Sequence, residues 1–252
     1  MGHVVNPISF RLGKYKNWRD QWFMKNNYYN MFHKTLWYQK YINSFFFYNK
    51  NLEQSSLQIS HLQVSHTGLN TRIRIYVYFG LLENYFQNIL NQYKSKYQYI
   101  VKNQILQISA NFFNVLKFIL ISELKRIEKR NFNVAFFLIN NANITASLIT
   151  RYFIRKLLHG FLVHEIIYPV LKDLKQNRNI QGFRLLCSGR FTRKQRAMIK
   201  WNRYKKMPLS TITANIDYST SSIPLKFGVG AFKLWLYLRK KPSDSSKSIR
   251  LL

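Results

Sequence analysis

Eight Lys and Arg side chains lie between Arg190 and Lys206, and no acidic residue interrupts them. Guanidinium and ammonium groups bind phosphate, whereas a merely solvated helix face normally mixes charges of both signs. The run therefore predicts contact with nucleic acid. Trp201 and Tyr204 lie within it, and their rings suit either stacking on bases or packing on a sheet.

The sequence contains no complete pattern of catalytic residues. His164-Glu165 begins a zinc-protease pattern, but Tyr168 stands where the second His is required. The few acids are scattered, so no carboxylate pair or metal cage is indicated. Cys187 is the single cysteine and lies in an apolar run, which favours a small buried side chain over a disulfide or zinc site. We predict no enzymatic activity, cofactor, metal or small-molecule substrate.

The overall charge requires a polyanionic partner. The 252 residues include 40 Lys and Arg against 9 Asp and Glu, for a formal net charge of +31. Self-repulsion on that scale is relieved by phosphate or by an anionic lipid surface. No window has the ~20 apolar residues of a membrane span, and the cations do not alternate with an apolar helix face. RNA is therefore favoured over a membrane.

Apolar spacing predicts the elements that position these cations. Alternating residues indicate a hairpin over 57–64 and 71–78, with a turn at 66–70. Helical patterns cover 28–50, 81–130 and 144–176, and a third strand is expected at 134–139. Three more strands are predicted at 183–187, 212–216 and 231–238, with the basic residues 190–206 as a turn and loop between the first two.

The chain is expected to be an α+β protein of two domains. A basic N-terminal arm covers 1–25, a first domain with three strands covers 26–145, and a second α+β domain covers 146–241. Residues 242–252, rich in Ser, are predicted to be a frayed tail. No cleavable presequence is expected before Met1. The abundance of Asn, Lys, Ile, Phe and Tyr, which have AT-rich codons, hints at an organelle genome.

Two separated sets of residues resemble the family of small-subunit ribosomal protein S-three. The arm carries Pro7, Arg11-Leu12-Gly13 and Trp18 in the family order. The C-terminal region resembles the family's C-terminal domain through its glycines, its Trp residues and a Pro-Leu to Asp-Tyr segment: Gly182, Ser188-Gly189-Arg190, Trp201, Pro208-Leu209, Thr211, Ala214, Ile216-Asp217-Tyr218, Phe227-Gly228 and Lys233-Leu234-Trp235-Leu236.

The resemblance implies a degenerate KH-like domain of type II, followed by a C-terminal α+β domain with an antiparallel or mixed sheet. A KH domain clamps single-stranded RNA with a Gly-x-x-Gly loop. Here Gly80 is followed by Leu81, Leu82 and Glu83, so the second glycine is missing. We predict no KH-type clamp and a rebuilt helical segment at 81–110. The family's paired Arg for mRNA are also missing, because the matching helix reads His164 to Tyr168.

The resulting hypothesis is a structural constituent of the mitochondrial ribosome, in the small-subunit head, that binds rRNA near the side at which mRNA enters. A free KH-type RNA-binding or ribosome-assembly factor is the alternative. Expected partners are head rRNA, the neighbouring proteins S-ten and S-fourteen, and mRNA if strand opening survives. The expected location is the mitochondrial matrix, with a plastid as the alternative. The predicted RNA-binding residues are Arg11, Lys14, Lys16, Arg19, Arg190, Arg193, Lys194, Arg196, Lys200, Arg203, Lys205, Lys206, Lys233 and Arg239.

Overall fold

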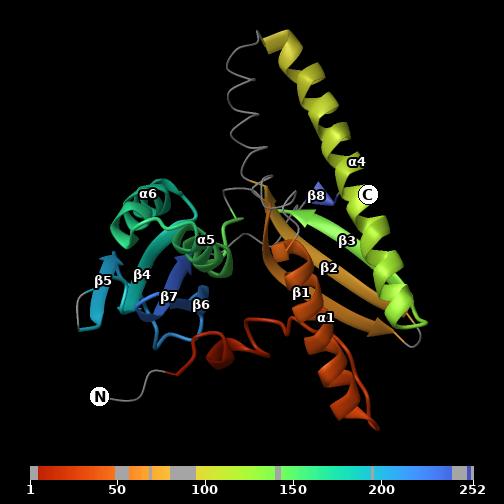
Figure 1. Cartoon of the computed structure of the whole chain (residues 1–252), viewed down its shortest axis with the longest axis horizontal. Coiled ribbons are helices and arrows are strands. Elements are labelled where there is room, and N and C mark those ends of the chain that lie inside the picture. Colours follow the sequence, from red (N-terminus) through yellow and green to blue (C-terminus); the bar gives the residue numbers. More distant parts are fainter. Residues whose placement is uncertain are drawn as a thin grey trace. The chain divides into compact units, whose positions relative to one another are not determined.

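The chain forms two compact units. The computed structural model describes residues 5–48, 57–67, 70–79, 95–139, 143–193, 196–239 and 249–250. The first unit consists of Arg19–Ile139 with Lys247–Leu252, and the second of Met1–Trp18 with Asn140–Ser246 (Figure 1). The N-terminal arm, expected to form a separate segment to residue 25, is thus divided at Trp18, and its first part belongs to the second unit.

The first unit is built from two described helices and a mixed sheet. The sheet order is β1-β2-β3-β8, with β1 antiparallel to β2 and β2 parallel to β3. The predicted hairpin is therefore confirmed. The elements are α1 (Tyr28–Tyr48), β1 (Leu57–Thr67), β2 (Asn70–Phe79), α4 (Ser95–Ile127), β3 (Asn131–Leu138) and β8 (Ile249–Arg250).

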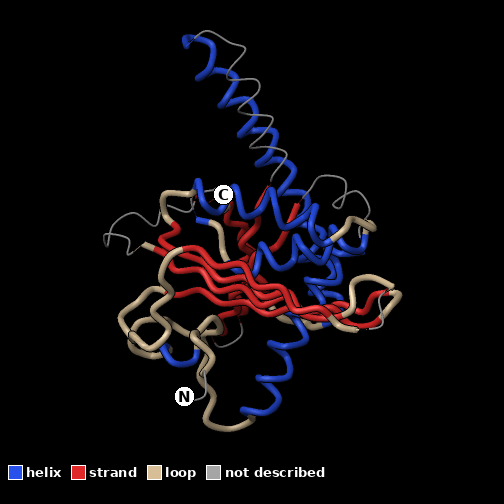
Figure 2. The backbone as a smooth tube through the Cα atoms, turned by 90° about the vertical axis from the view of Figure 1, so that its left-hand side faces the viewer, coloured by secondary structure: helices blue, strands red, loops and turns tan. Residues whose placement is uncertain are grey.

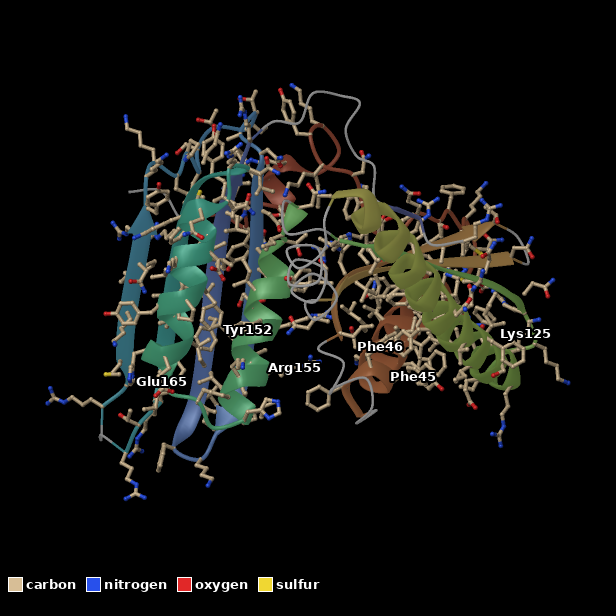
Figure 3. All side chains as sticks on the ribbon, turned by 90° about the horizontal axis from the view of Figure 1, so that it is seen from above. Phe45, Phe46, Lys125, Tyr152, Arg155 and Glu165 are labelled. Carbon is tan, nitrogen blue, oxygen red and sulfur yellow. The ribbon has the colours of Figure 1, made fainter. Side chains whose placement is uncertain are left out.

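The core of the first unit lies on one face of this sheet. Successive side chains of a strand point to opposite faces, so the alternating Ile73, Ile75 and Val77 of β2 all face the same way and are fully buried. They meet Tyr38 of α1 and Leu120 of α4 in one cluster. Figure 3 shows both helices on the same side of the strands. The other face of the sheet has no described helix against it.

A polar contact links α1 to the junction between α4 and β3. The Tyr38 hydroxyl donates a hydrogen bond to Glu128, whose carboxylate also lies 3.2 Å from the Lys34 ammonium. Burial alone would raise the pKa of Glu128, but these two partners and the charge of Arg130 lower it below its ordinary value. The carboxylate is therefore held in its charged form at neutral pH.

The predictions for residues 81–130 and for the C-terminal tail have different outcomes in the first unit. The helical pattern of 81–130 is represented by α4, which begins at Ser95, whereas Gly80 and residues 81–94 lie outside the described residues. The KH-type clamp at Gly80 is therefore not tested. The predicted frayed tail is wrong at its end, because Ile249 and Arg250 pair antiparallel with Leu138 and Phe137.

The second unit is a four-stranded antiparallel sheet with two helices on one face (Figures 1 and 2). The strand order is β5-β4-β7-β6. Leu185, Phe232 and Leu234 pack with Phe153 of α5 in its core. The elements are α5 (Ala146–Leu158), α6 (Val163–Gln176), β4 (Ile180–Gly189), β5 (Met198–Tyr204), β6 (Ile216–Leu225) and β7 (Gly228–Leu238).

Two strand predictions in this unit are corrected. The basic residues 190–206 were expected to be a turn and loop, but their second half is β5, which pairs with β4. The strand predicted at 212–216 begins only at Ile216 and runs on to Leu225. Strand β5 is at the edge of the sheet, where only one neighbour has to be matched. Its charged residues obscure the apolar alternation that identifies a half-buried strand.

Gly189, at the end of β4, is expected to tolerate no side chain. Its φ is +134°, and an added Cβ would lie 2.3 Å from the carbonyl oxygen of Val229. Replacing Gly189 with Ala should lower the free energy of unfolding of the second unit by about 1–3 kcal/mol. Chemical denaturation checks this, with Gly160→Ala as a control, because that glycine also has positive φ but open space around it. Equal losses in the two variants would show that close approach to Val229 does not matter.

Candidate nucleic-acid interface

The face of the second sheet that points away from the helices presents cations and aromatic rings. Leu185 belongs to the helix-covered core, so its neighbour Arg184 points to the opposite, open face. Trp201 of β5 pairs with Leu186, and Arg203 pairs with Arg184, which places Trp201 and Arg203 on this open face. Edge strand and open face together form the candidate site.

Arg184 lies between two tryptophan rings on this face. Its guanidinium carbon is 4.2 Å from the ring centre of Trp201 and 5.3 Å from that of Trp235. Arg203 approaches the Trp201 ring at 5.4 Å. Burial lowers the pKa of Arg184, and the charge of Arg203 lowers it further, but a guanidinium stays protonated. The result is a cationic aromatic cluster, which we call the Trp–Arg ladder (Arg184, Trp201, Arg203 and Trp235).

Trp201 both packs on the sheet and leaves part of its ring free to stack on a base, the two possibilities that the sequence allowed. Its ring packs against Arg184 and stacks at 6.4 Å from Trp235, yet 43% of its surface is exposed. Exposed aromatic faces stack on unpaired bases, and nearby guanidinium groups neutralise phosphate. The ladder is therefore chemically suited to single-stranded or loop RNA. Trp235 is only 8% exposed, so its contribution to the ladder is to pack against Arg184 and Trp201.

Most of the predicted cations in the connector are accessible. Arg190 is half-buried, and its Nη2 donates to the carbonyl oxygen of Arg193 at 3.4 Å. Lys233 of β7 pairs with Leu186 and so shares the open face with Trp201. Lys194 lies outside the described residues. Outside the N-terminal arm, the exposed members of the predicted set are Arg193, Arg196, Lys200, Arg203, Lys205, Lys206, Lys233 and Arg239.

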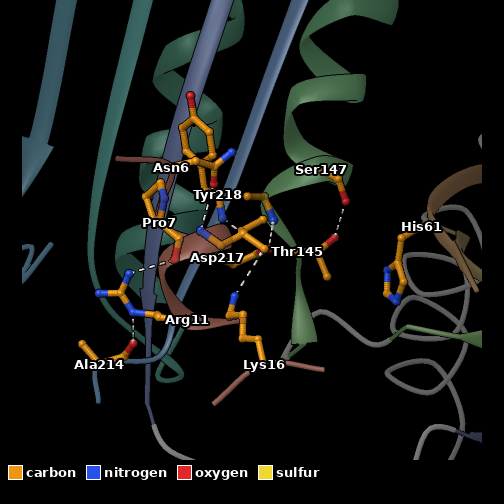
Figure 4. Close-up of polar contacts among 12 residues, drawn as sticks. Asn6, Pro7, Arg11, Lys16, His61, Thr145, Ser147, Ala214, Asp217 and Tyr218 are labelled. Carbon is orange, nitrogen blue, oxygen red and sulfur yellow. Dashed lines mark hydrogen bonds and ion pairs between the residues drawn. The ribbon is translucent and has the colours of Figure 1, made fainter. Parts of the chain in front are cut away.

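Arg11 does not contact RNA in the predicted way, because it is buried. Its side chain is 1% exposed, and its guanidinium donates five hydrogen bonds to backbone carbonyls. Four of these carbonyls belong to the loop between β5 and β6. The acceptors are Pro7 at 2.9 Å, Pro208 at 3.4 Å, Leu209 at 3.1 Å, Thr211 at 2.6 Å and Ala214 at 2.8 Å. Figure 4 shows the bonds to Pro7 and Ala214. The fork of donors shapes this loop and holds the arm against it.

The other predicted cations of the arm have different surroundings. The Lys16 ammonium lies 3.9 Å from the Asp217 carboxylate (Figure 4). The same carboxylate accepts a hydrogen bond of 2.7 Å from the Ala146 amide at the start of α5. Gly13 allows the arm to turn between Arg11 and Lys16, with φ of +83°. Lys14 and Arg19 are exposed, but Arg19 belongs to the first unit. Lys14 and Arg19 stay the predicted RNA contacts of the arm.

Arg184 was not among the residues predicted from the sequence to bind RNA. It lies inside a strand whose neighbours are apolar, and a lone charge in such a strand is easily taken for a solvated residue. A usable signal was present, because the strand alternates Phe183, Leu185 and Cys187 with Arg184 and Leu186. That alternation assigns Arg184 to the second face. The sequence did not reveal which tryptophans lie next to Arg184, because that depends on how β4 pairs with β5 and β7.

Trp235 is expected to be a major contributor to stability, although it does not share an interior with Leu185. It pairs with Tyr218 of β6, its ring lies 5.1 Å from the Tyr218 ring, and it faces away from the helices. Trp235→Ala should lower the free energy of unfolding of the second unit by roughly 3–5 kcal/mol. Denaturant unfolding provides the measurement, with the exposed Trp18→Ala as control. A loss below about 1 kcal/mol would mean that the ring contributes little packing.

The described residues give little support to a reactive thiol, a catalytic acid, a metal site or a membrane-spanning helix. Cys187 is buried, which raises the pKa of its thiol to about 12 and disfavours reactivity at neutral pH. Glu165 accepts a hydrogen bond from the Leu162 amide at the start of α6 and so has a structural task. Within the described ranges, His, Cys, Asp and Glu side chains form no group suited to a metal ion. No described helix is long and apolar enough to span a membrane.

Comparison with known proteins agrees with this geometry. Residues 154–236, which contain the Trp–Arg ladder, match the model of the family "Ribosomal protein S3, C-terminal domain". Small ribosomal subunit protein uS3m of Acanthamoeba castellanii is 24% identical, over 97% of this chain and 98% of the relative. Protein uS3 of Persephonella marina is also 24% identical, over 99% and 95%, and uS3c of Chaetosphaeridium globosum is 28% identical over 39% of each chain.

The similarity extends well beyond the matched domain. Two of these relatives align over nearly their whole length, and the family model independently covers the unit that carries the cationic connector. Similarity to a family of structural ribosomal proteins also supports the prediction that the chain is not an enzyme. The family match over residues 154–236 and the nearly full-length similarity to two uS3 proteins together support a ribosomal protein of the uS3 type.

Proposed function

We propose that this chain is a structural constituent of a mitochondrial ribosome, in the head of the small subunit, where it binds rRNA near the side at which mRNA enters. The observation that carries the proposal is the exposed, acid-free connector beside the Trp–Arg ladder. Arg193, Lys200 and Arg203 are exposed on or next to one edge strand, in a chain with a formal charge of +31. Such an edge neutralises several phosphates at once.

The mitochondrial location is supported by one of the relatives. The Acanthamoeba castellanii protein uS3m matches almost the entire chain. The amino-acid bias toward AT-rich codons points the same way. A plastid is the competing location, for which the uS3c similarity over 39% of the chain is the corresponding observation. Fractionation of organelles separates the two.

Neighbouring proteins are proposed to cover the outer side of α4. The inner side of this helix packs on the sheet through Leu116 and Leu120, whereas Val115 and Phe118 are 59% and 74% exposed. Apolar side chains exposed in this way mark a protein contact. The head proteins S-ten and S-fourteen are the partners that the family resemblance implies. Opening of mRNA is not part of the proposal, because α6 exposes His164 and Tyr168 where the family has paired Arg.

A free KH-type RNA-binding protein or assembly factor is the second candidate. The order helix, two antiparallel strands, helix and parallel third strand in the first unit supports a KH-like domain of type II. A fold alone does not establish the function, since many functions share one fold. The two candidates differ in whether the chain stays in the mature particle.

Sedimentation of native organelle lysate is the deciding experiment. We expect the chain to co-sediment with the small subunit, to resist moderate salt, and to be released when the rRNA is digested. The isolated chain should bind small-subunit rRNA with a log–log salt slope of about −7 to −9 if on the order of ten phosphates are contacted. Presence only in precursor particles would favour the assembly factor. Recovery in the free or membrane fraction would overturn both candidates.

A further inference from the structure

The face of the first sheet that lacks described helices has a row of aromatic rings across three strands. His61, Tyr76 and Phe137 are direct cross-strand partners in β1, β2 and β3. The ring centres of His61 and Tyr76 are 4.2 Å apart with planes inclined by 12°, and those of Tyr76 and Phe137 are 5.1 Å apart with planes inclined by 19°. The rings therefore form one continuous stack, the aromatic row.

A hollow lies beside the aromatic row. It has a volume of about 550 Å³, within the usual range of ligand pockets. Its lining includes Ala135, whose side chain is smaller than those of the other lining residues. It is lined by Arg72, Ile73, Arg74 and Tyr76 from β2 and by Asn133, Ala135 and Phe137 from β3. Arg72 and Arg74 are exposed, whereas the side chain of Ile73 belongs to the core on the other face of the sheet. The residues come from adjacent strands in register, so the hollow is held by the sheet itself.

The charge and composition of this face identify the kind of partner. In the described parts of β1, β2 and β3, the residues on this face include Arg72 and Arg74 but no acid. They also include no Val, Leu, Ile or Met. Protein interfaces are also rich in aromatic rings and arginine, but their buried centre is more apolar than this face, which has no aliphatic side chain larger than that of Ala135. Guanidinium groups for phosphate, stacked rings for bases and the Asn133 amide for a base edge are instead the groups that bind nucleotides.

We propose that this face, through the aromatic row, Arg72, Arg74 and Asn133, is a second RNA-binding surface that takes one or two unpaired nucleotides. The strand must be unpaired, because base faces inside an A-form helix are covered by their neighbours. One base extends or enters the aromatic row, and its phosphates meet the arginines. The surface is independent of a Gly-x-x-Gly loop, and it lies in a different unit from the Trp–Arg ladder.

The test measures binding of labelled hexauridylate to the full chain by fluorescence anisotropy at several salt concentrations. Tyr76→Thr keeps a strand-forming residue but removes the central ring, and it should weaken binding by about tenfold with no change in salt slope. Arg74→Gln should reduce the slope by about 0.7. Ala135→Leu fills the hollow without changing charge and should also weaken binding by about tenfold. A blunt RNA duplex should respond to Tyr76→Thr by less than about twofold.

Matched controls separate this surface from the general attraction of a highly basic chain. Tyr168→Thr removes an exposed ring from α6, and Arg126→Gln removes an exposed charge from α4. Neither should reproduce the effect of its counterpart. If the folded Tyr76→Thr and Ala135→Leu variants bind hexauridylate within about twofold of the unmodified chain, the proposal is wrong. Should Tyr76→Thr fail to fold, the Ala135→Leu result decides alone.

Cross-linking in the native particle gives a second decision. Contact of residues 70–79 or 131–138 with rRNA or mRNA supports the proposal, whereas cross-links to a protein at both segments would overturn it. Failure here is distinguishable from failure of the ribosomal function. If the chain sediments normally with the small subunit but the Tyr76→Thr variant binds hexauridylate as well as the unmodified chain, only the proposal of a second RNA-binding surface is wrong.

Discussion

Reversal of three connector charges is expected to prevent incorporation of the chain into the small subunit. Arg193, Lys200 and Arg203 are exposed, so Glu at these positions leaves the core of the second unit unchanged. Each reversal removes a cation that releases counterions from phosphate and adds a repulsive charge. The triple variant should bind small-subunit rRNA at least about a hundredfold more weakly at physiological salt, with a salt slope smaller by about 2–3.

The first unit supplies a control with the same change in net charge. Lys125, Arg126 and Lys129 are exposed at the end of α4 and beyond it. Their reversal to Glu should reduce rRNA affinity much less if the connector makes specific phosphate contacts. Both variants are compared by sedimentation with the particle and by filter binding to rRNA. Equal losses in the two would mean that only overall charge matters, and unchanged incorporation of the connector variant would show that the connector is merely solvated.

Replacement of the buried Arg11 with Met should destabilise the second unit by about 3–5 kcal/mol. Met has a similar length but donates no hydrogen bond, so the carbonyls of Leu209, Thr211 and Ala214 lose their partner. A buried acceptor without a partner costs about 1–3 kcal/mol, and several are affected together. Arg11→Lys should restore only part of the stability, because an ammonium lacks the planar fork.

Hydrogen exchange is the suitable measurement, because two units need not unfold in one transition. In Arg11→Met, amides of the loop at 207–215 and of β6 should exchange faster, while those of β2 and β3 should keep their rates. Lys14→Met, which removes the same charge from an exposed position, should change stability by less than about 0.5 kcal/mol. If the loop amides of Arg11→Met kept their protection, the arm would not be what holds the loop.

Local pattern was sufficient for much of the fold. The hairpin of β1 and β2 follows from alternation of apolar residues, because a strand with one buried face must place every second side chain in the core. Helix α1 and the strand β3 follow from similar periodicity, and the connector follows from charge alone. These features depend on residues close together in the chain, so spacing is enough to recognise them. The connector's exposure was also predictable, since unpaired cations cannot be buried cheaply.

Other features depend on which distant segments meet, and no local pattern contains that information. Arg11 reads as one more basic residue of an arm, but its Nε donates to a carbonyl 203 residues away. Edge strand β5 is recognised only by its ladder with β4, because its charges hide its alternation. The aromatic row unites three strands, and its third member comes after α4. Burial and ring stacking are properties of pairs of segments brought together, so the folded chain alone determines whether a cation binds RNA or holds its own backbone.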